Sequence, residues 1–336
     1  MDAEQTTPPT APSLGRVTIK NFKSIKEVAF DTRRINLFVG RPNTGKSNIL
    51  EAVSLLGATK SISSIRFHKI RDLFYGLNDD VEIEIASRKT SIIIRRIESS
   101  YFLNRSDVHL MPLRHDGVTR TQVLENGDFK EPFSIVVSDS EVPEAVVSDL
   151  VWLERFYESV AVNLIVRALR RDKNLYSVLE SIVDSYGFQI AFYGDDFVLS
   201  QKKGGEALVL IPFSMISDTM RRLFFYFSLI SLASNRFLGP DYVLLLEEPE
   251  VHSYPPYIKT LAEKISSAKT NQFFIATHSP YLLETLYENA EDDELQVFVV
   301  DYQNHQTVVQ PVDNEALGEL IDNRADVFFN LHNLVS

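Results

Sequence analysis

The stretch INLFVGRPNTGKS, residues 35–47, decides the fold of this chain because it joins an apolar run to a glycine-bounded loop. The β-branched and aromatic residues of INLFV predict a buried strand. Gly40, Gly45, Lys46 and Ser47 then have the spacing of a phosphate-binding loop. Successive backbone N–H groups of such a loop surround phosphates, and the following helix N-terminus adds a favourable dipole.

A helix is predicted directly after the loop. Its apolar residues recur at the helical period and Gly57 closes it; they are Ile49, Leu50, Val53 and Leu56. In this strand–loop–helix context Lys46 is expected to reach the β- and γ-phosphates, and the Ser47 hydroxyl to bind Mg²⁺. The ligands expected are therefore ATP and Mg²⁺.

Composition limits the class of protein. The chain has 336 residues, 44% of them hydrophobic, and no run of the roughly 18 apolar residues that a membrane span needs. The absence of cysteine excludes disulfides and thiolate metal sites. Residues 1–13 are rich in Pro and Thr and are predicted to form a disordered tail. We expect a cytoplasmic protein without a membrane partner.

Residues 14–336 are interpreted as one α/β domain. Strands are predicted within 16–39, and a β-rich lobe at about 80–137. A helical insertion is expected at about 143–187, where the first helix would run unbroken to residue 171. From residue 217 onward helices and strands alternate, which implies a parallel sheet covered by helices.

The insertion is expected to continue with a second helix and a hairpin. LYSVLESIVDSYG, ending at Gly187, has a helical pattern. FQIAFYGDDFVLSQ follows it and predicts two strands that turn at Gly194 and Asp195.

Two further motifs follow apolar strands. In YVLLLEEPE, residues 242–250, Glu247 would hold the Mg²⁺ shell and Glu248 would polarise the attacking water. In FFIATHSP, residues 273–280, His278 stands where a donor can sense the γ-phosphate. Each has a simpler interpretation, a strand ending in a charged turn or a surface histidine, but the three motifs in this order support one another.

The segments IKNFKSIKEV, FVGRPNTGKSNILEAVSLL, LLLEEPEVHSYPP and IATHSPYLL resemble, in this order, the ABC-type ATPase heads of the RecF/SMC-like group. The resemblance is nearest to the OLD family and related stand-alone ATPases of bacterial genome defence. It is strong at both ends of the chain and nearly absent at 90–210. It implies an ABC-ATPase-type P-loop NTPase with a mixed N-terminal β lobe, a parallel-sheet core covered by helices, and a helical insertion.

The resemblance also implies roles for individual residues. Lys46, Glu248 and His278 would be catalytic, and Ser47 and Glu247 would bind the metal. His252 falls in the loop after the second motif. Heads of this group dimerise around two ATP molecules. The residues expected to contact the nucleotide are Lys23, Ser24, Gly40, Asn43, Thr44, Gly45, Lys46, Ser47, Asn48 and Ser217.

The chain departs from the group at several positions. Glu247 replaces a more common Asp, and Arg41-Pro42-Asn43 stands where relatives often have Pro-Asn-Gly. The segment ISDTMRR, residues 216–222, lacks the glycine of a signature segment. Ser217 therefore has two interpretations, a donor to the γ-phosphate of a partner subunit or a plain helix cap.

Nuclease chemistry is not expected. OLD-type nucleases carry a TOPRIM domain that needs a D-x-D pair, and this chain contains none. Asp116, Asp128 and Lys130 only faintly resemble another nuclease arrangement. The chain is expected to hydrolyse ATP and to cut nothing itself.

Three functions remain open. The first is an ATPase whose dimer, or higher oligomer, gates a separately encoded effector, a nuclease or toxin in anti-phage defence. The second is a RecF-like DNA-binding ATPase of replication or repair, against which the acidic C-terminal quarter counts. The third is a nucleotide-binding scaffold with little turnover.

Overall fold

The computed structural model describes most of the chain. The described residues are 14–57, 65–88, 90–107, 118–123, 146–148, 160–194, 196–203, 207–235, 243–323, 326–330 and 334. The expected tail at 1–13, the weak nuclease candidates Asp116, Asp128 and Lys130, and Asp195 of the expected hairpin turn lie outside these residues.

A six-stranded central sheet carries the functional loops. Its strand order is β15-β14-β3-β13-β12-β8, and the neighbouring pairs from β14 to β8 are parallel while β15 is antiparallel. The bounds are β15 (Gln306–Pro311), β14 (Leu295–Gln303), β3 (Ile35–Val39), β13 (Gln272–Ala276), β12 (Val243–Glu247) and β8 (Val146–Ser148). The expected parallel sheet is confirmed.

Both faces of this sheet are buried. Successive side chains of a strand point to opposite faces, so each strand contributes to two cores. On one face Phe38 lies between Phe274 and Phe298, with ring centroids 6.3 and 5.1 Å away. On the other face Leu37 and Val297 join a second core. The apolar runs in the sequence, without polar alternation, are those of strands covered on both sides.

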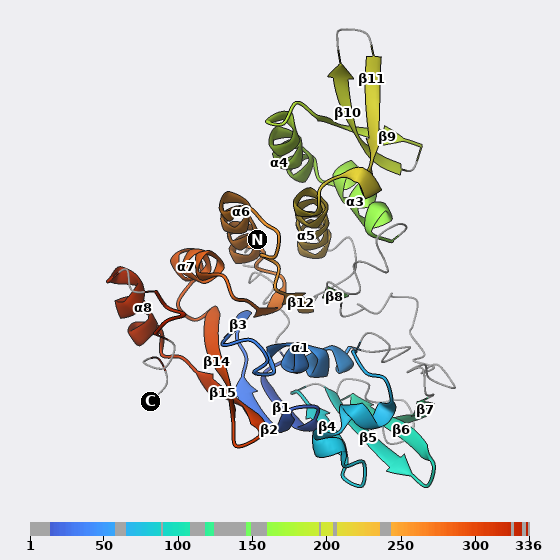
Figure 1. Ribbon diagram of the computed structural model, residues 1–336, viewed down its shortest axis with the longest axis vertical. Coiled ribbons are helices and arrows are strands. Elements are labelled where there is room, and N and C mark those ends of the chain that lie inside the picture. Colours follow the sequence, from blue (N-terminus) through green and yellow to red (C-terminus); the bar gives the residue numbers. More distant parts are fainter. Residues whose placement is uncertain are drawn as a thin grey trace, which may run out of the picture.

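The first face packs against α1 (Lys46–Leu55) and an antiparallel N-terminal sheet (Figure 1). That sheet has the order β2-β1-β4-β5-β6-β7. The bounds are β1 (Arg16–Phe22), β2 (Ile25–Asp31), β4 (Ile83–Ala86), β5 (Thr90–Ile97), β6 (Ser100–Asp107) and β7 (Val118–Val123), with short helices η1 (Ile70–Leu73) and η2 (Tyr75–Leu77) before β4. The β-rich lobe thus includes strands from residue 16 onward.

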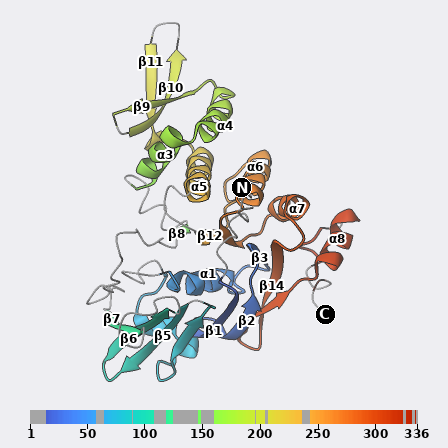
Figure 2. The same ribbon diagram turned by 180° about the vertical axis from the view of Figure 1, so that it is seen from behind.

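The second face is covered by a layer of helices. These are α5 (Asp218–Ser234), α6 (Pro255–Ser267), α7 (Pro280–Asn289) and α8 (Asn314–Asp322). Beyond α5 stand α3 (Val160–Arg171), α4 (Lys173–Asp184) and a small sheet of β9 (Gln189–Tyr193), β10 (Asp196–Lys203) and β11 (Ala207–Pro212), followed by η3 (Phe213–Met215). Figure 2 shows this module and the N-terminal sheet at opposite ends of the molecule.

The prediction of one unbroken helix from about residue 143 to residue 171 is wrong. Val146–Ser148 form β8, which pairs in parallel with β12, and α3 begins only at Val160. The free edge of β12 offers hydrogen bonds to the β-branched pair Val146 and Val147, and this tertiary pairing outweighs the local helical pattern.

The rest of the expected insertion agrees with the structure. The second helix and the hairpin are confirmed as α4, β9 and β10, while β11, β15 and α8 had not been anticipated. Among the described helices, none is long and apolar enough to cross a lipid bilayer.

Candidate functional site

The phosphate-binding loop joins β3 to α1 in a conformation that needs glycine at two positions. Gly40 and Gly45 have φ of 154° and 103°, which L side chains rarely adopt. A Cβ at Gly40 would lie 2.1 Å from the carbonyl oxygen of Val300. The loop closes around the buried Lys46, whose Nζ donates to the carbonyls of Gly40 (3.1 Å) and Arg41 (2.8 Å).

The other two motifs lie at the same edge of the sheet, because β3, β13 and β12 are adjacent and parallel. Glu247 ends β12, and Glu248 follows it with φ of 43°, its N–H donating to Ala276 (2.8 Å). His278 follows β13, and its Nε2 lies 3.5 Å from Oε1 of Glu248. The structure therefore brings the predicted catalytic groups together.

The close approach of the three motifs shifts the pKa values of two of their side chains, Lys46 and His278. Burial lowers the pKa of Lys46 to about 8, while the nearby carboxylates of Glu248, Glu247 and Glu250 oppose that change. Burial and the positive charge of Lys46 also lower the pKa of His278, against the effect of Glu248. These two effects favour the neutral form of the imidazole, which lies beside a carboxylate.

Glu250 is a third carboxylate of this edge and was not among the predicted site residues. Its Oε1 accepts the backbone N–H of His278 at 2.7 Å. Burial raises the pKa of Glu250, and hydrogen bonds from His278 and the Thr277 hydroxyl act in the opposite direction. The carboxylate thereby fixes the loop that carries the histidine.

A second cluster links α1 to the end of β12. Glu51 is 5% exposed and accepts from Arg66 Nε at 2.7 Å through Oε1. Its Oε2 pairs with Lys23, whose Nζ also donates to the carbonyl of Arg66 (2.7 Å). Arg66 Nη2 lies 3.5 Å from Oε1 of Glu247. Lys23, expected near the phosphates, is therefore engaged by Glu51.

The remaining loop residues hold the loop itself. Ser24 accepts from Asn48 Nδ2 at 2.7 Å. The Thr44 hydroxyl donates to the carbonyl of Arg41 (2.9 Å), and Asn43 takes a left-handed φ of 62°. Ser24 and Asn48 thus lie beside the loop, and Asn43 and Thr44 shape it from within; their contact with a nucleotide stays a prediction.

Ser217 is exposed and occupies the N-cap position of α5, yet its side chain makes no capping hydrogen bond. The neighbouring Thr219 hydroxyl donates to the carbonyl of His252 in the loop after Glu248. Within one subunit the segment 216–222 is thus tied to the loop that follows the second motif.

The donor set suits a hard divalent cation. The Ser47 hydroxyl and the Glu247 carboxylate supply oxygen ligands, which Mg²⁺ prefers, and Mg²⁺ is commonly held by one or two protein groups together with substrate phosphates. In the described part of the chain no cluster of three His, Cys, Asp or Glu residues forms a self-contained metal site. The residues therefore fit a metal bound jointly with phosphate.

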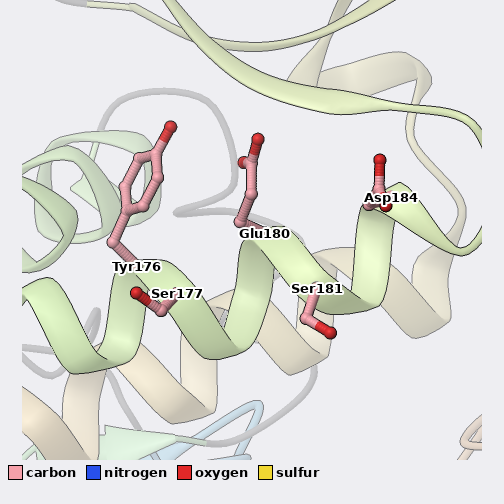
Figure 3. A pocket seen from close by; sticks show the side chains of 5 residues that line it. All are labelled: Tyr176, Ser177, Glu180, Ser181 and Asp184. Atoms are coloured by element: carbon pink, nitrogen blue, oxygen red, sulfur yellow. The ribbon is translucent and has the colours of Figure 1, made fainter.

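A shallow pocket lies elsewhere, on α4. Figure 3 shows Tyr176, Glu180 and Asp184 pointing to one side, with Ser177 and Ser181 on the other. Oε2 of Glu180 accepts the N–H of Ile190 in β9 (2.9 Å). All the lining residues lie on α4, so the pocket is separate from the site at the sheet edge. Its lining also lacks basic side chains that would bind phosphate.

Weak signals in the sequence pointed to the residues that were missed. Glu51 is a charged residue within the apolar helix pattern ILEAV, and Glu250 is the third carboxylate of LLLEEPE. Arg66 stands near Lys69 and Arg71 in the sequence and there looks like one member of a basic cluster. Thr307, which packs against the phosphate-binding loop, carries no local signal at all.

The strand order and the three converging motifs are those of an ABC-type ATPase fold. A family model described as "AAA domain, putative AbiEii toxin, Type IV TA system" matches residues 35–284. The chain belongs to this family of ATPase domains. No curated protein sequence matches it significantly.

Solved structures agree on the fold. The chain is similar to an Smc head bound to the C-winged helix domain of ScpA, with a TM-score of 0.58, 16% identity, and coverage of 92% of this chain and 100% of that one. The chain is also similar to an Smc head with an extended coiled coil, bound to the C-terminal domain of ScpA derived from Pyrococcus furiosus. That match has a TM-score of 0.53 and 14% identity, and it covers 92% of this chain and 98% of that one. At these identities the likeness establishes the fold alone.

Proposed function

We propose that this chain binds Mg-ATP and hydrolyses it, and that nucleotide-dependent dimerisation gates a separately encoded partner. The observation that carries the proposal is the meeting of Lys46, Glu248 and His278 at one edge of the central sheet. A phosphate-binding lysine, a carboxylate for water and a sensor for the γ-phosphate are the groups that phosphoryl transfer to water requires.

Each group has a distinct role in the proposal. Lys46 and the backbone N–H groups of the loop hold the β- and γ-phosphates. Ser47 and Glu247 would hold Mg²⁺, which when bound would neutralise the negative charge that develops on the phosphates. Glu248 orients the attacking water and accepts its proton, while His278 donates a hydrogen bond to the γ-phosphate.

The position of Ser217 supports the proposed dimerisation. Its hydroxyl is exposed and makes no capping bond to its own helix, so it is available to the γ-phosphate bound by a second copy. The N-terminus of α5 also offers unpaired backbone N–H groups to an anion. ATP would then join two heads, and hydrolysis would separate them.

A protein effector is the partner that we favour. The family description links such domains to a toxin–antitoxin system, and the effector that we propose is a nuclease or toxin in anti-phage defence. A head of the same fold has been solved with a domain of another protein bound to it. The module of α3 and α4, with Arg170 and Arg171 in the last turn of α3, is the candidate docking element.

Direct DNA binding receives less support. In the N-terminal sheet Arg95 lies 3.2 Å from Glu82, and Arg96 pairs with Asp79 (3.2 Å) and Asp80 (2.6 Å). Neutralised arginines contribute little to phosphate attraction on DNA. A nucleotide-binding scaffold with little turnover would bind ATP but show negligible ATP hydrolysis in the wild-type protein.

The deciding experiment is light scattering on Glu248→Gln with and without Mg-ATP. This variant keeps the shape of the site and should accumulate the ATP-bound dimer, so the mass should double from the 38.3 kDa of one chain. Lys46→Ala is the matched control and should stay monomeric. A Glu248→Gln protein that binds ATP yet keeps the mass of one chain would overturn nucleotide-driven dimerisation.

A further inference from the structure

The edge strand β15 supports the phosphate-binding loop from behind. Thr307 of β15 is 1% exposed, and its Oγ1 donates to the carbonyl of Thr44 at 2.9 Å. The same oxygen lies 2.7 Å from the hydroxyl of Ser24, and the Thr307 N–H donates to the Ser24 carbonyl at 2.8 Å. A residue more than 250 positions away in sequence thus contacts the loop directly.

The hydroxyls form a chain with a single direction. Asn48 Nδ2 can only donate, so Ser24 Oγ accepts from it. The carbonyl of Thr44 can only accept, so the Thr307 hydroxyl gives its proton there. The Ser24 hydroxyl therefore donates to Thr307, and every hydrogen bond of the chain is satisfied. A partly buried, fully satisfied network of this kind favours one geometry.

This hydrogen-bond network packs closely against the loop at Gly45. A Cβ at Gly45 would lie 2.1 Å from Thr307 Oγ1 and 2.8 Å from Ser24 Oγ. Gly45 is followed by Lys46 and Ser47, whose backbone N–H groups begin α1. Movement of Thr307 would therefore shift the N–H groups that phosphate binding needs.

We propose that Thr307 is a positioning residue for the phosphate-binding loop, acting through Thr44 and Ser24 and touching no nucleotide itself. Its hydroxyl fixes the Thr44–Gly45 turn so that the N–H groups at the start of α1 are aimed before the phosphates arrive. Such preorganisation raises affinity by lowering the ordering cost of binding. The nucleotide part of this inference rests on the proposed function.

The test compares Thr307→Val with Thr307→Ser. Valine keeps the shape, removes the donor to the Thr44 carbonyl, and removes the acceptor of the Ser24 hydroxyl, which still accepts from Asn48. Hydrogen exchange of the loop peptide, in protein without nucleotide, should become about tenfold faster in Thr307→Val. Thr307→Ser keeps the hydroxyl and should exchange like the wild type.

Thr270→Val is the matched control. It also removes a hydroxyl that donates to a backbone carbonyl, that of Ser234 at 3.2 Å, but it lies in the turn between α6 and β13, at the opposite end of β13 from the loop. Its loop exchange should match the wild type. Equal loop exchange in Thr307→Val and wild type would overturn the inference, whatever the protein does with ATP.

Affinity for ATP, measured by calorimetry on the same proteins, separates the inference from the proposed function. The Kd should rise about tenfold in Thr307→Val and recover in Thr307→Ser. A wild-type protein that bound no ATP would overturn the proposed function, while the exchange data would still decide the role of Thr307. Faster loop exchange with an unchanged Kd would overturn the claim of preorganisation.

Discussion

The backbone N–H of His278 donates to Oε1 of Glu250 at 2.7 Å, and this bond joins the loops that follow β13 and β12. The same two loops meet at the side chains, where His278 Nε2 lies 3.5 Å from Glu248. The histidine is therefore fixed at its backbone by one carboxylate and faces a second. Small movements of either loop would change the distance between the two proposed catalytic groups.

Glu250→Ala should consequently lower kcat about tenfold or more while the Kd for ATP changes little. Alanine removes the acceptor of the His278 N–H, and small misplacements of catalytic groups are costly to rate. Steady-state ATPase kinetics together with calorimetry give both quantities. Glu250→Gln, which retains an oxygen acceptor, serves as the control and should lie much closer to the wild type. Equal loss in the two variants would contradict a positioning role.

Glu248→Gln should bind ATP and turn it over at least about a hundredfold more slowly than the wild type, because an amide cannot accept the proton of the attacking water. Single-turnover hydrolysis with excess protein measures this step without product release. Hydrolysis at the wild-type rate would show that another group activates the water.

Glu51→Gln should lower the free energy of unfolding by about 3 kcal/mol, since it leaves the partly buried Lys23 without its carboxylate. Chemical denaturation measures the change. Glu82→Gln is the matched control, because Glu82 forms an exposed pair with Arg95, and the cost should stay below about 1 kcal/mol. Similar costs for both variants would contradict a special role for the Glu51 cluster.

Much of the site could be predicted because its chemistry is local in sequence. The loop at 40–47 and the carboxylates Glu247 and Glu248 each follow a strand within a few residues, and the parallel order of those strands brings their ends together. Strand β3, helix α1 and the alternation after residue 217 follow from the same periodic patterns.

What could not be predicted depends on contacts between distant segments. Strand β8 exists because an edge of β12 is available to Val146 and Val147, and no local pattern reports that edge. Thr307 supports the loop only because β15 folds back along β14 and beside β2. Arg66 looks like one cation among several until Glu51 and Glu247 are seen around it.

A further ion pair joins the residues just before β3 and β14 of the central sheet, and it predicts how the stability of the fold depends on pH. Arg34, 7% exposed at its side chain, contacts Glu294 through Nε at 2.8 Å and through Nη2 at 2.9 Å. Burial acts to raise the pKa of Glu294, but hydrogen bonds from Arg34 and Lys269 outweigh it and hold the pKa below 4.5. The charged pair therefore stabilises the fold above pH 4.5.

Glu294→Gln should lower the free energy of unfolding at pH 7 by about 3 kcal/mol, because Arg34 loses its charged partner. Because the folded-state pKa is depressed, the wild-type advantage is complete above the unfolded value and disappears as pH falls through the folded one. Denaturant unfolding at pH 7 and pH 3 should thus show a difference that shrinks with acid. Glu291→Gln, which removes only an exposed contact with Lys269, should cost under about 1 kcal/mol at either pH. An equal deficit of Glu294→Gln at both pH values would contradict this account.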